Sequence, residues 1–527
     1  MFSSSCDTMV AMSDVTDDGS IIFGKNSDRQ VNEPLAIRYV PAATHLPNSK
    51  LRTTYIEIDQ VEKTHSCILF SPTNIFGAEM GFNCHGLVIG NEALFTKIPS
   101  YREGLTGMDL VRLVLERCST SREGKETIIY LLNKYGQGGN CGFTSKFYYH
   151  SRIHTISNII SFGNIQTFDE YSKNLIEQAI ENRWCHSIDD FHFQKCYSGL
   201  SFYPKEFYNA FIKTHFASGQ IRQHRSKDLI ENLSKKSNKK SSQFTLIDMF
   251  NVLRDHKHSR NSPSNGLTNV DICMHAGFGP IKFNQTTGSL VSVIPRSNNS
   301  IPVHYATCTS LPCLSIYKPI WLVSESIPPA FISSSNNSIS NPSLTYSSNN
   351  IWWKSEIINR NIIKYYNKLI KKIQFERNKL EYDIVCQSKI LLSRDISQEQ
   401  RNNLTVLYFH KADQLTNEWF RRAYKLSFEI ESELSLCQEL TWKRWRTSAN
   451  IPYYLIKYSK VEFDIKNYIV LYFLLLILFL FNQFYFIIIF SLFIIYLLLI
   501  KIIPKKTKTK EKDQHIKLER LNFNDEN

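Results

Sequence analysis

The chain begins with two short apolar runs separated by a polar turn, and a cysteine stands at the head of the first run. Cys6 opens Cys6-Asp-Thr-Met-Val-Ala-Met12, the turn contains Asp17-Asp-Gly-Ser20, and the second run reads Ile21-Ile-Phe-Gly-Lys-Asn-Ser-Asp-Arg29. Apolar runs bounded by turn residues predict a pair of β-strands. We therefore expect Cys6 to head a buried strand that faces a second strand ending in Lys-Asn-x-Asp.

The position of Cys6 has a chemical meaning if the chain is cleaved just before it. A free thiol has a pKa near ~8.5 and a free α-amino group near ~7.7, so the amine of an N-terminal Cys6 is a suitable base beside its own sulfur. Phe2 is too bulky for ordinary trimming of the initiator methionine, so we predict cleavage between Ser5 and Cys6 with residues 1–5 as a propeptide. The alternative is a small buried cysteine in a strand, which is common for Cys.

Charge and cysteine usage exclude several function classes. The formal net charge of +14 is spread along the chain, and the basic runs Arg222–Lys240 and Lys501–Lys512 lack interleaved aromatics. We therefore expect no nucleic-acid partner, and contact with anionic lipid or water instead. The 12 cysteines include no C-x-x-C pair and no His/Cys cluster at zinc spacing. This pattern predicts mostly free thiols in a reducing compartment, with no metal and no cofactor.

Between Cys6 and residue 332 the sequence predicts one mixed domain. Apolar runs bounded by turns predict strands, and apolar residues at helical spacing predict helices. The expected strands are 8–12, 21–24, 54–58, 67–70, 87–90, 289–294, 303–308 and 314–323; the expected helices are 107–117, 125–135, 168–184 and 246–255. This order indicates two sheets covered by helices, and there is no G-x-G-x-x-G or P-loop that would indicate a nucleotide fold.

The remaining sequence divides into four parts. Residues 333–350 are almost all Ser and Asn and predict a linker. Residues 351–445 are charged, low in Gly and Pro and apolar at helical spacing, which predicts a helical hairpin packed on the main domain, or else a coiled-coil partner site. Residues 466–503 hold a long apolar segment, and residues 504–527 form a basic polar tail.

The apolar segment predicts attachment to a membrane. As a helix, residues 468–500 would reach about 50 Å, against a hydrocarbon core of about 30 Å. Either one tilted span or a hairpin turning at Asn482-Gln483 fits this length. Lysines from Lys501 onward place the C-terminus in the cytosol by the positive-inside rule, and without a signal peptide the catalytic domain is expected there too.

Several motifs recur in a fixed order after Cys6. They are Phe23-Gly-Lys-Asn-Ser-Asp-Arg29, Ile75-Phe-Gly-Ala-Glu-Met-Gly-Phe-Asn-Cys-His-Gly-Leu-Val-Ile-Gly-Asn-Glu92, the helix at 107–117 leading to Tyr135-Gly-Gln-Gly-Gly-Asn140, His154-Thr-Ile-Ser-Asn158, Leu253-Arg-Asp-His256 and Trp352-Trp353. In this combination, residues 6–443 resemble the cysteine dipeptidase family that includes the secernins, N-terminal nucleophile (Ntn) hydrolases similar in fold to bile-salt hydrolases and penicillin V acylases. The resemblance implies an α+β fold, a four-layer αββα sandwich, followed here by the helical region and the transmembrane segment.

The resemblance also implies catalytic roles for named residues. Cys6 would be the nucleophile, and Lys25 stands where acylases carry an arginine that lowers the thiol pKa. Asp28 would hold the new α-amine.

Two asparagines and two arginines complete the implied site. Asn91 would donate to an oxyanion, and Asn158 would orient the amine or bind the tetrahedral intermediate. Arg222 or Arg225 would match the later, substrate-binding arginine. Each residue also has an ordinary structural interpretation, such as a turn pair or a cap, and Glu79 is interpreted as a structural carboxylate.

The implied function is a cysteine-type dipeptidase acting on dipeptides or small amides at a membrane lipid surface, with a homo-oligomer as a further possibility. The alternatives are a secernin-like, non-hydrolytic protein in exocytosis or vesicle traffic, and an acylase for another linear amide. One departure concerns activity: a pair of strands found in relatives is missing after Ser151. The pair should lie centrally in a sheet beside the site, so its loss should leave unpaired backbone and an exposed edge.

Overall fold

The computed structural model describes residues 5–94, 96–98, 103–139, 141–145, 152–160, 163–168, 170–172, 174–198, 218–235, 244–256, 262–266, 270–277, 282–297, 299–322, 343–393 and 395–457. The chain divides into two compact units, Met1–Ser459 and Lys460–Asn527. All described residues belong to the first unit. The expected propeptide therefore lies outside the described residues except for Ser5.

Two antiparallel sheets form the centre of the first unit. The six-stranded sheet has the order β12 (Ile153–Ile156), β1 (Ser5–Ala11), β2 (Ile21–Gln30), β13 (Asn284–Ile294), β14 (Val303–Ala306) and β15 (Lys318–Ile320). The five-stranded sheet has the order β11 (Cys141–Ser145), β10 (Val88–Ala93), β9 (Met80–Asn83), β8 (Cys67–Pro72) and β3 (Leu35–Val40). Two small ribbons pair β4 (Ala43–Thr44) with β7 (Lys63–Thr64) and β5 (Lys50–Arg52) with β6 (Glu57–Asp59).

Alternating side chains show that the two sheets pack face to face. In β8, Ile68 and Phe70 enter an apolar layer that also contains Val10 of β1, whereas the intervening Leu69 packs with a helix. In β1, Met9 enters a different cluster from Val10. Because successive strand residues point to opposite faces, each sheet buries one face against the other sheet and its second face against helices.

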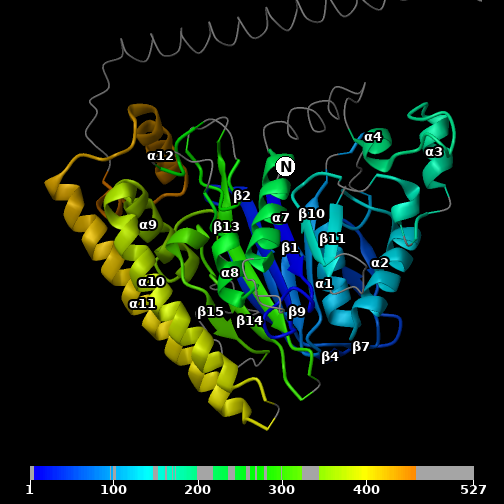
Figure 1. Cartoon of the computed structure of the whole chain (residues 1–527), viewed down its shortest axis with the longest axis horizontal. Coiled ribbons are helices and arrows are strands. Elements are labelled where there is room, and N and C mark those ends of the chain that lie inside the picture. The colour runs from blue at the N-terminus through cyan, green and yellow to red at the C-terminus, as the bar shows by residue number, and fades with distance from the viewer. Residues whose placement is uncertain are drawn as a thin grey trace, which may run out of the picture. The chain divides into compact units, whose positions relative to one another are not determined.

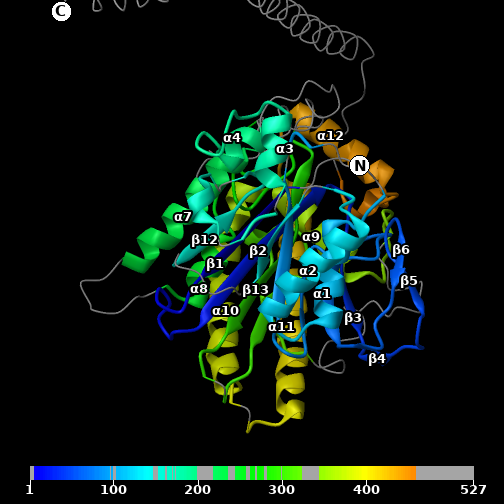
Figure 2. The ribbon, with the colours of Figure 1, turned by 90° about the vertical axis from the view of Figure 1, so that its right-hand side faces the viewer.

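Helices cover the two outer faces (Figures 1 and 2). Helices α1 (Gly107–Arg117) and α2 (Ser121–Tyr135) cover the five-stranded sheet, while α7 (Gly219–Lys235), α8 (Leu246–Val252) and α9 (Ile351–Ile363) lie over the six-stranded sheet. Beyond them are α10 (Tyr366–Ile390), α11 (Gln398–Glu429) and α12 (Leu436–Ser448), and α3 (Leu175–Glu181) and α4 (Phe193–Tyr197) are short helices. Single 3₁₀ turns occur at η1 (Ile165–Thr167), η3 (Pro312–Leu314) and η5 (Tyr453–Leu455). The layers therefore run helix, sheet, sheet, helix.

Local sequence signals explain where some elements differ from expectation. Helix α2 starts earlier than predicted because Thr120 caps it by accepting from Glu123 N. The strand expected at 314–323 shrinks to β15, because Leu311 adopts a left-handed φ of 55° and leads into the η3 turn at Pro312. The helix expected at 168–184 is reduced to α3.

The C-terminal helices pack against the main domain. Trp352 and Trp353 of α9 join the same apolar cluster as Met9 and Val291 of the six-stranded sheet. Figure 2 shows α10 and α11 side by side as an antiparallel pair, joined by the segment between them. The helical region thus belongs to the same compact unit as the two sheets.

The expectation of a membrane-spanning segment is corrected here. Among the helices of the described residues, none combines the length and the apolar character needed to cross a bilayer. The apolar run at 468–500 itself lies outside the described part. The membrane location and the cytosolic orientation deduced from that run therefore have no support in the structure.

The strands that flank the gap after Ser151 are both edge strands. β11 ends the five-stranded sheet and β12 ends the six-stranded sheet, and residues 146–151 between them lie outside the described part. β1, which carries Cys6, is paired with β12 on one side and β2 on the other. Among the described strands, β12 therefore lies between β1 and one sheet edge, and β11 lies between β10 and the edge of the other sheet.

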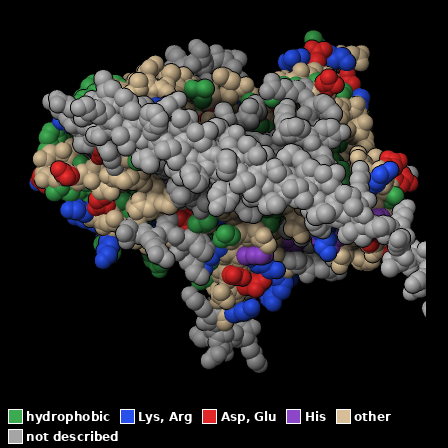
Figure 3. Space-filling model, turned by 90° about the horizontal axis from the view of Figure 1, so that it is seen from above, with side chains coloured by type: hydrophobic (Ala, Val, Ile, Leu, Met, Phe, Trp, Pro, Cys, Tyr) green, Lys and Arg blue, Asp and Glu red, His purple; other side chains and the backbone are tan. Residues whose placement is uncertain are grey.

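Within the described part of the basic run, residues 222–235, each Lys and Arg side chain pairs with an acidic side chain. Arg222 and Arg225 pair with Asp7 and Asp255, and two lysines of α7 pair with Glu231. Where described side chains are visible from above, Lys and Arg lie next to Asp and Glu (Figure 3).

A buried ion pair joins the helical layer to the domain and generates a stability prediction. Arg254, just after α8, donates through both terminal nitrogens to Glu381 of α10, with Nη1 2.7 Å from Oε2, and both side chains are almost fully buried. Breaking such a pair leaves an uncompensated buried charge, which costs about 3–5 kcal/mol. We expect Glu381→Gln to lower the midpoint of thermal unfolding, measured by circular dichroism.

The matched control is Glu418→Gln, because Glu418 pairs with Arg421 on the exposed side of α11. Exposed pairs contribute about 0–1 kcal/mol, so this variant should unfold close to the wild-type temperature. Equal unfolding temperatures for the two variants would show that the Arg254–Glu381 pair does not hold the helical layer.

Candidate active site

The strand pair β1–β2 sends its polar side chains to two opposite faces. Cys6 and Thr8 share the face of Val10, toward the five-stranded sheet, and Lys25 shares the face of Phe23. Asp7 and the intervening residues of β2 point to the helical side. Period-two alternation therefore divides the polar residues near Cys6 into two groups.

The first group surrounds the sulfur of Cys6. The Sγ atom lies 3.8 Å from Oε2 of Glu79, and the other oxygen of Glu79 pairs with Arg29. Lys25 Nζ lies 3.8 Å from Oε1 of Glu92, which also accepts from Thr8. These charged side chains are all buried.

A glycine lets Lys25 occupy this layer between the sheets. A Cβ at Gly90 of β10 would stand 2.5 Å from Lys25 Cδ and 3.2 Å from Phe23 Cζ. A larger residue would therefore push the lysine stem away from the sulfur. Gly90 is required here for close approach of the two sheets rather than for backbone conformation.

The thiol of Cys6 is held in its neutral form. Burial raises the pKa of Cys6 to about 12, the negative charges of Glu79 and Asp28 act in the same direction, and the Lys25 cation opposes them. Burial likewise raises the pKa of Glu92 to about 8, against the effect of Lys25. In the chain that still carries Ser5, the sulfur therefore has to lose its proton before it can act as a nucleophile.

The second group surrounds the backbone nitrogen of Cys6. The Cys6 N–H donates to Oδ1 of Asn158 at 2.8 Å, and the same oxygen accepts from Nη2 of Arg222 at 2.9 Å. Asn158 follows β12 with a left-handed φ of 61° and donates through Nδ2 to Ala93 O at 2.9 Å. The Asn158 side chain, positioned by its left-handed backbone, thus holds the Cys6 nitrogen, which cleavage before Cys6 would turn into a free amine.

Arg222 compensates two buried carboxylates in this group. Its Nη1 atom lies 2.5 Å from Asp7 Oδ2 and 3.9 Å from Asp28 Oδ2. Burial raises the pKa of Asp28 to about 7, the charge of Asp7 raises it further, and Arg222 opposes both. Asp28 also accepts from the Thr286 hydroxyl at 2.6 Å. Asp28 is therefore poised to exchange a proton near neutral pH.

Asn91 hydrogen-bonds to Glu79, mainly to its main-chain carbonyl oxygen and also to its carboxylate. Its backbone N–H donates to Glu79 O at 3.0 Å. With its amide turned to satisfy its neighbours, Nδ2 donates to Glu79 O at 3.0 Å and lies 3.3 Å from Glu79 Oε2. The amide that was expected to serve an oxyanion is thus occupied by Glu79 in this form.

The structure brings six of the seven expected site residues together. Cys6, Lys25, Asp28, Asn91, Asn158 and Arg222 all lie within or beside the two groups. Arg225 differs, because its guanidinium is occupied by Asp255, at 2.9 Å from Nε and 2.7 Å from Nη2.

Four charged residues of the site were missed or taken as structural in the sequence: Asp7, Arg29, Glu79 and Glu92. Asp7 follows Cys6 directly, and strand alternation could have placed it on the helical face. Glu79 and Arg29 gave no such signal, because their pairing depends on the stacking of two sheets.

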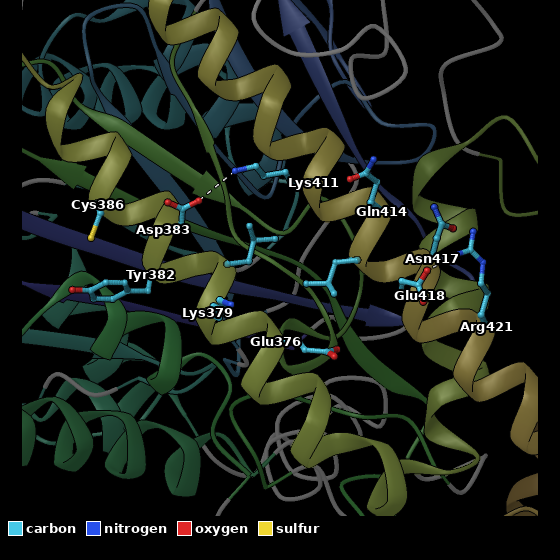
Figure 4. Close-up of a pocket in the computed structure, with 12 residues that line it drawn as sticks. Glu376, Lys379, Tyr382, Asp383, Cys386, Lys411, Gln414, Asn417, Glu418 and Arg421 are labelled. Atoms are coloured by element: carbon cyan, nitrogen blue, oxygen red, sulfur yellow. Dashed lines mark hydrogen bonds and ion pairs between the residues drawn. The ribbon is translucent and has the colours of Figure 1, made fainter.

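One sizeable groove of the described part lies away from Cys6. A groove of about 1040 Å³ lies between α10 and α11, lined by charged and apolar side chains and crossed by the Lys411–Asp383 ion pair (Figure 4). None of the site residues lines it. The chemistry therefore centres on the buried Cys6 groups.

The chain is similar to three solved structures at low identity. Two are variants of the conjugated bile acid hydrolase from Clostridium perfringens, both 13% identical, with TM-scores of 0.32 and 0.29, covering 60% and 57% of this chain and 92% and 88% of theirs. The third is penicillin V acylase from Agrobacterium tumefaciens, 9% identical with a TM-score of 0.30, covering 60% of this chain and 87% of that chain. No protein-family model matches the sequence.

Two substitutions near the sulfur should shift the pKa of Cys6 in opposite directions. Glu79→Gln removes a negative charge, so the pKa of Cys6 should fall; Lys25→Met removes a cation, so that pKa should rise. Because only the thiolate reacts, each pKa unit changes the alkylation rate at a fixed pH by about tenfold. We expect iodoacetamide to label Cys6 faster in Glu79→Gln and more slowly in Lys25→Met, measured by peptide mass mapping.

Cys84 is exposed and serves as the internal control in the same maps. Its labelling rate should be equal in all three proteins. If both variants shift the Cys6 rate in the same direction, access rather than charge controls this thiol.

Proposed function

We propose that this chain is an amide hydrolase of the Ntn type, in which Cys6 becomes the N-terminal nucleophile. The single observation that carries the proposal is the hydrogen bond from the Cys6 N–H to Asn158, which is backed by Arg222. A structural cysteine in a strand needs no buried asparagine, arginine and aspartate around its main-chain nitrogen. Strongly perturbed, buried ionisable groups of this kind cluster at functional sites.

The first step of the proposal is maturation. The Cys6 thiol loses its proton as its sulfur attacks the carbonyl carbon of Ser5, the Ser5–Cys6 peptide bond breaks, and the leaving nitrogen takes up that proton to become a free amine. Water then hydrolyses the thioester and releases residues 1–5 as a carboxylic acid. Asn158 and Arg222 hold the leaving nitrogen and the Cys6 carbonyl, the latter 3.3 Å from Arg222 Nη1.

The second step is turnover. The new amine takes the thiol proton, and the sulfur attacks the carbonyl of an amide substrate. The amine product leaves with that proton, and water hydrolyses the thioester to release the acid. Lys25 stabilises the thiolate, Asp28 orients the amine, and Asn91 donates to the oxyanion once its amide leaves Glu79.

Within this class we propose a cysteine-type dipeptidase, on the basis of the motif resemblance. An acylase for another linear amide uses the same groups. The secernin-like, non-hydrolytic function has one observation in its favour: the Cys6 thiol is fully buried and neutral in this form. Hydrolysis of amide substrates by the purified protein would favour the enzyme over the non-hydrolytic function.

The proposal is tested by trapping the acyl-enzyme intermediate. The purified full chain is mixed with a panel of dipeptides and N-acyl amino acids, quenched in acid and mapped by mass spectrometry. We expect an acyl group on Cys6 and release of the free amine product. Cys6→Ala should lose at least about a thousandfold in rate, because removal of a nucleophile costs that much or more.

Cys84→Ala removes an exposed thiol and should keep the wild-type rate. Hydrolysis that survives in Cys6→Ala, or an acyl group on another cysteine, would contradict the proposal. Preference for dipeptides over N-acyl amino acids would favour the dipeptidase.

A further inference from the structure

Four residues outside the Cys6 site form a buried cluster of thiols and imidazoles. His256 follows α8, Cys273 and His275 lie on the irregular segment 270–277, and Cys313 is the central residue of η3. One ligand atom from each residue lies within 4.8 Å of the other three. Three segments that are distant in sequence therefore present two sulfurs and two nitrogens to one point.

The measured distances fit a tetrahedral metal site. His275 Nε2 lies 3.1 Å from Cys313 Sγ and 3.7 Å from Cys273 Sγ. With Zn–S bonds of about 2.3 Å and Zn–N bonds of about 2.0 Å, the edges of a tetrahedron are roughly 3.3–3.8 Å. Small side-chain movements would therefore bring the four atoms to bonding positions.

The cluster leaves polar atoms buried without partners. Cys273, His275 and Cys313 are almost fully buried. Among the described residues, Nε2 of His256 and Nδ1 of His275 have no hydrogen-bond partner. A buried polar atom without a partner is unfavourable, so these two nitrogens need an explanation. His275 faces both sulfurs through Nε2, so that nitrogen would bind the metal ion, and His256 would supply the second imidazole nitrogen.

We propose that His256, Cys273, His275 and Cys313 bind one Zn²⁺ ion. Two thiolates and two imidazoles are the ligand set of structural zinc sites, and they contain no hard oxygen ligand that would favour Mg²⁺ or Ca²⁺. Four protein ligands fill the coordination sphere, so the site is closed and structural rather than catalytic. Around it, Arg377 Nη1 donates to Cys313 O at 2.5 Å, and the Tyr366 ring lies 6.1 Å from that of His275.

The proposed zinc ion would also fix the position of Thr286, which contacts Asp28 of the Cys6 site. Met274, between two of the ligands, donates its N–H to Thr286 Oγ1 at 3.0 Å and accepts from Thr286 N at 2.9 Å. The same Thr286 hydroxyl donates to Asp28. This consequence for Asp28 depends on the proposed function, whereas the metal site itself does not.

The test measures metal in the protein itself. The full chain is purified without chelators or a metal-affinity tag, and zinc is counted by inductively coupled plasma mass spectrometry. We expect about one Zn²⁺ per chain in the wild type, and its loss in Cys273→Ser and Cys313→Ser. Two control variants should retain it: Cys308→Ala, a buried cysteine near Cys313, and Cys84→Ala, from the partly exposed His65–Cys84–His85 group.

A second measurement needs no variant and so does not depend on folding of the mutants. Exchange of the wild-type protein with Co²⁺ should give the visible absorption and the thiolate charge-transfer bands of a tetrahedral cobalt site. The proposal is overturned if the wild type contains no zinc and takes up no Co²⁺ after reduction. It is equally overturned if Cys84→Ala, and not the Cys273 and Cys313 variants, loses the metal, or if peptide mapping finds a Cys273–Cys313 disulfide in place of metal.

Discussion

The guanidinium of Arg222 is the contact on which the geometry around Cys6 depends. It joins helix α7 to Asp7 in β1, to the Cys6 carbonyl and to Asn158 after β12. Because Arg222 is fully buried, its charge must be compensated inside the protein, and Asp7 and Asp28 provide that compensation. Removing the guanidinium would leave the buried carboxylates of Asp7 and Asp28 without their cation. It would also remove one of the two hydrogen bonds to Asn158 Oδ1, the atom that accepts from the Cys6 N–H.

Strand alternation turns one short strand into two separate electrostatic environments. The sulfur lies between the sheets with Glu79 and Lys25, while the nitrogen lies on the helical side with Asn158 and Arg222. A buried charge is expensive, and this region contains four acids and three cations at 0–8% exposure: Asp7, Asp28, Glu79, Glu92, Lys25, Arg29 and Arg222. Such a concentration costs stability and is typical of a site that must move protons. The raised pKa of Cys6 fits a precursor in which the base has not yet been released.

The strands that carry Cys6, Lys25 and Asn91 could be predicted from their apolar runs, whereas the choice of Lys25, Asn91 and Asn158 as site residues depended on the motif resemblance. The partners of those residues could not be predicted in the same way. Glu79 pairs with Arg29 only because the two sheets stack. Arg225 pairs with Asp255 and not with the site, and the spacing of residues in the sequence does not predict this ion pair. The His/Cys cluster was missed for a related reason: its ligands come from three segments without the close spacing of zinc fingers. The apolar run at 468–500 predicted a membrane helix, which the described residues do not contain.

The central claim is that Cys6 carries both the thiol and the amine, and the mature N-terminus tests it most directly. The full chain and its Cys6→Ala variant are expressed in parallel, and the first residue of each is determined by intact-mass and N-terminal peptide mass spectrometry. The wild type should begin at Cys6 with a free amine, and Cys6→Ala should keep the preceding residues. A wild-type protein that hydrolyses amides while still beginning at Met1 or Phe2 would contradict the account.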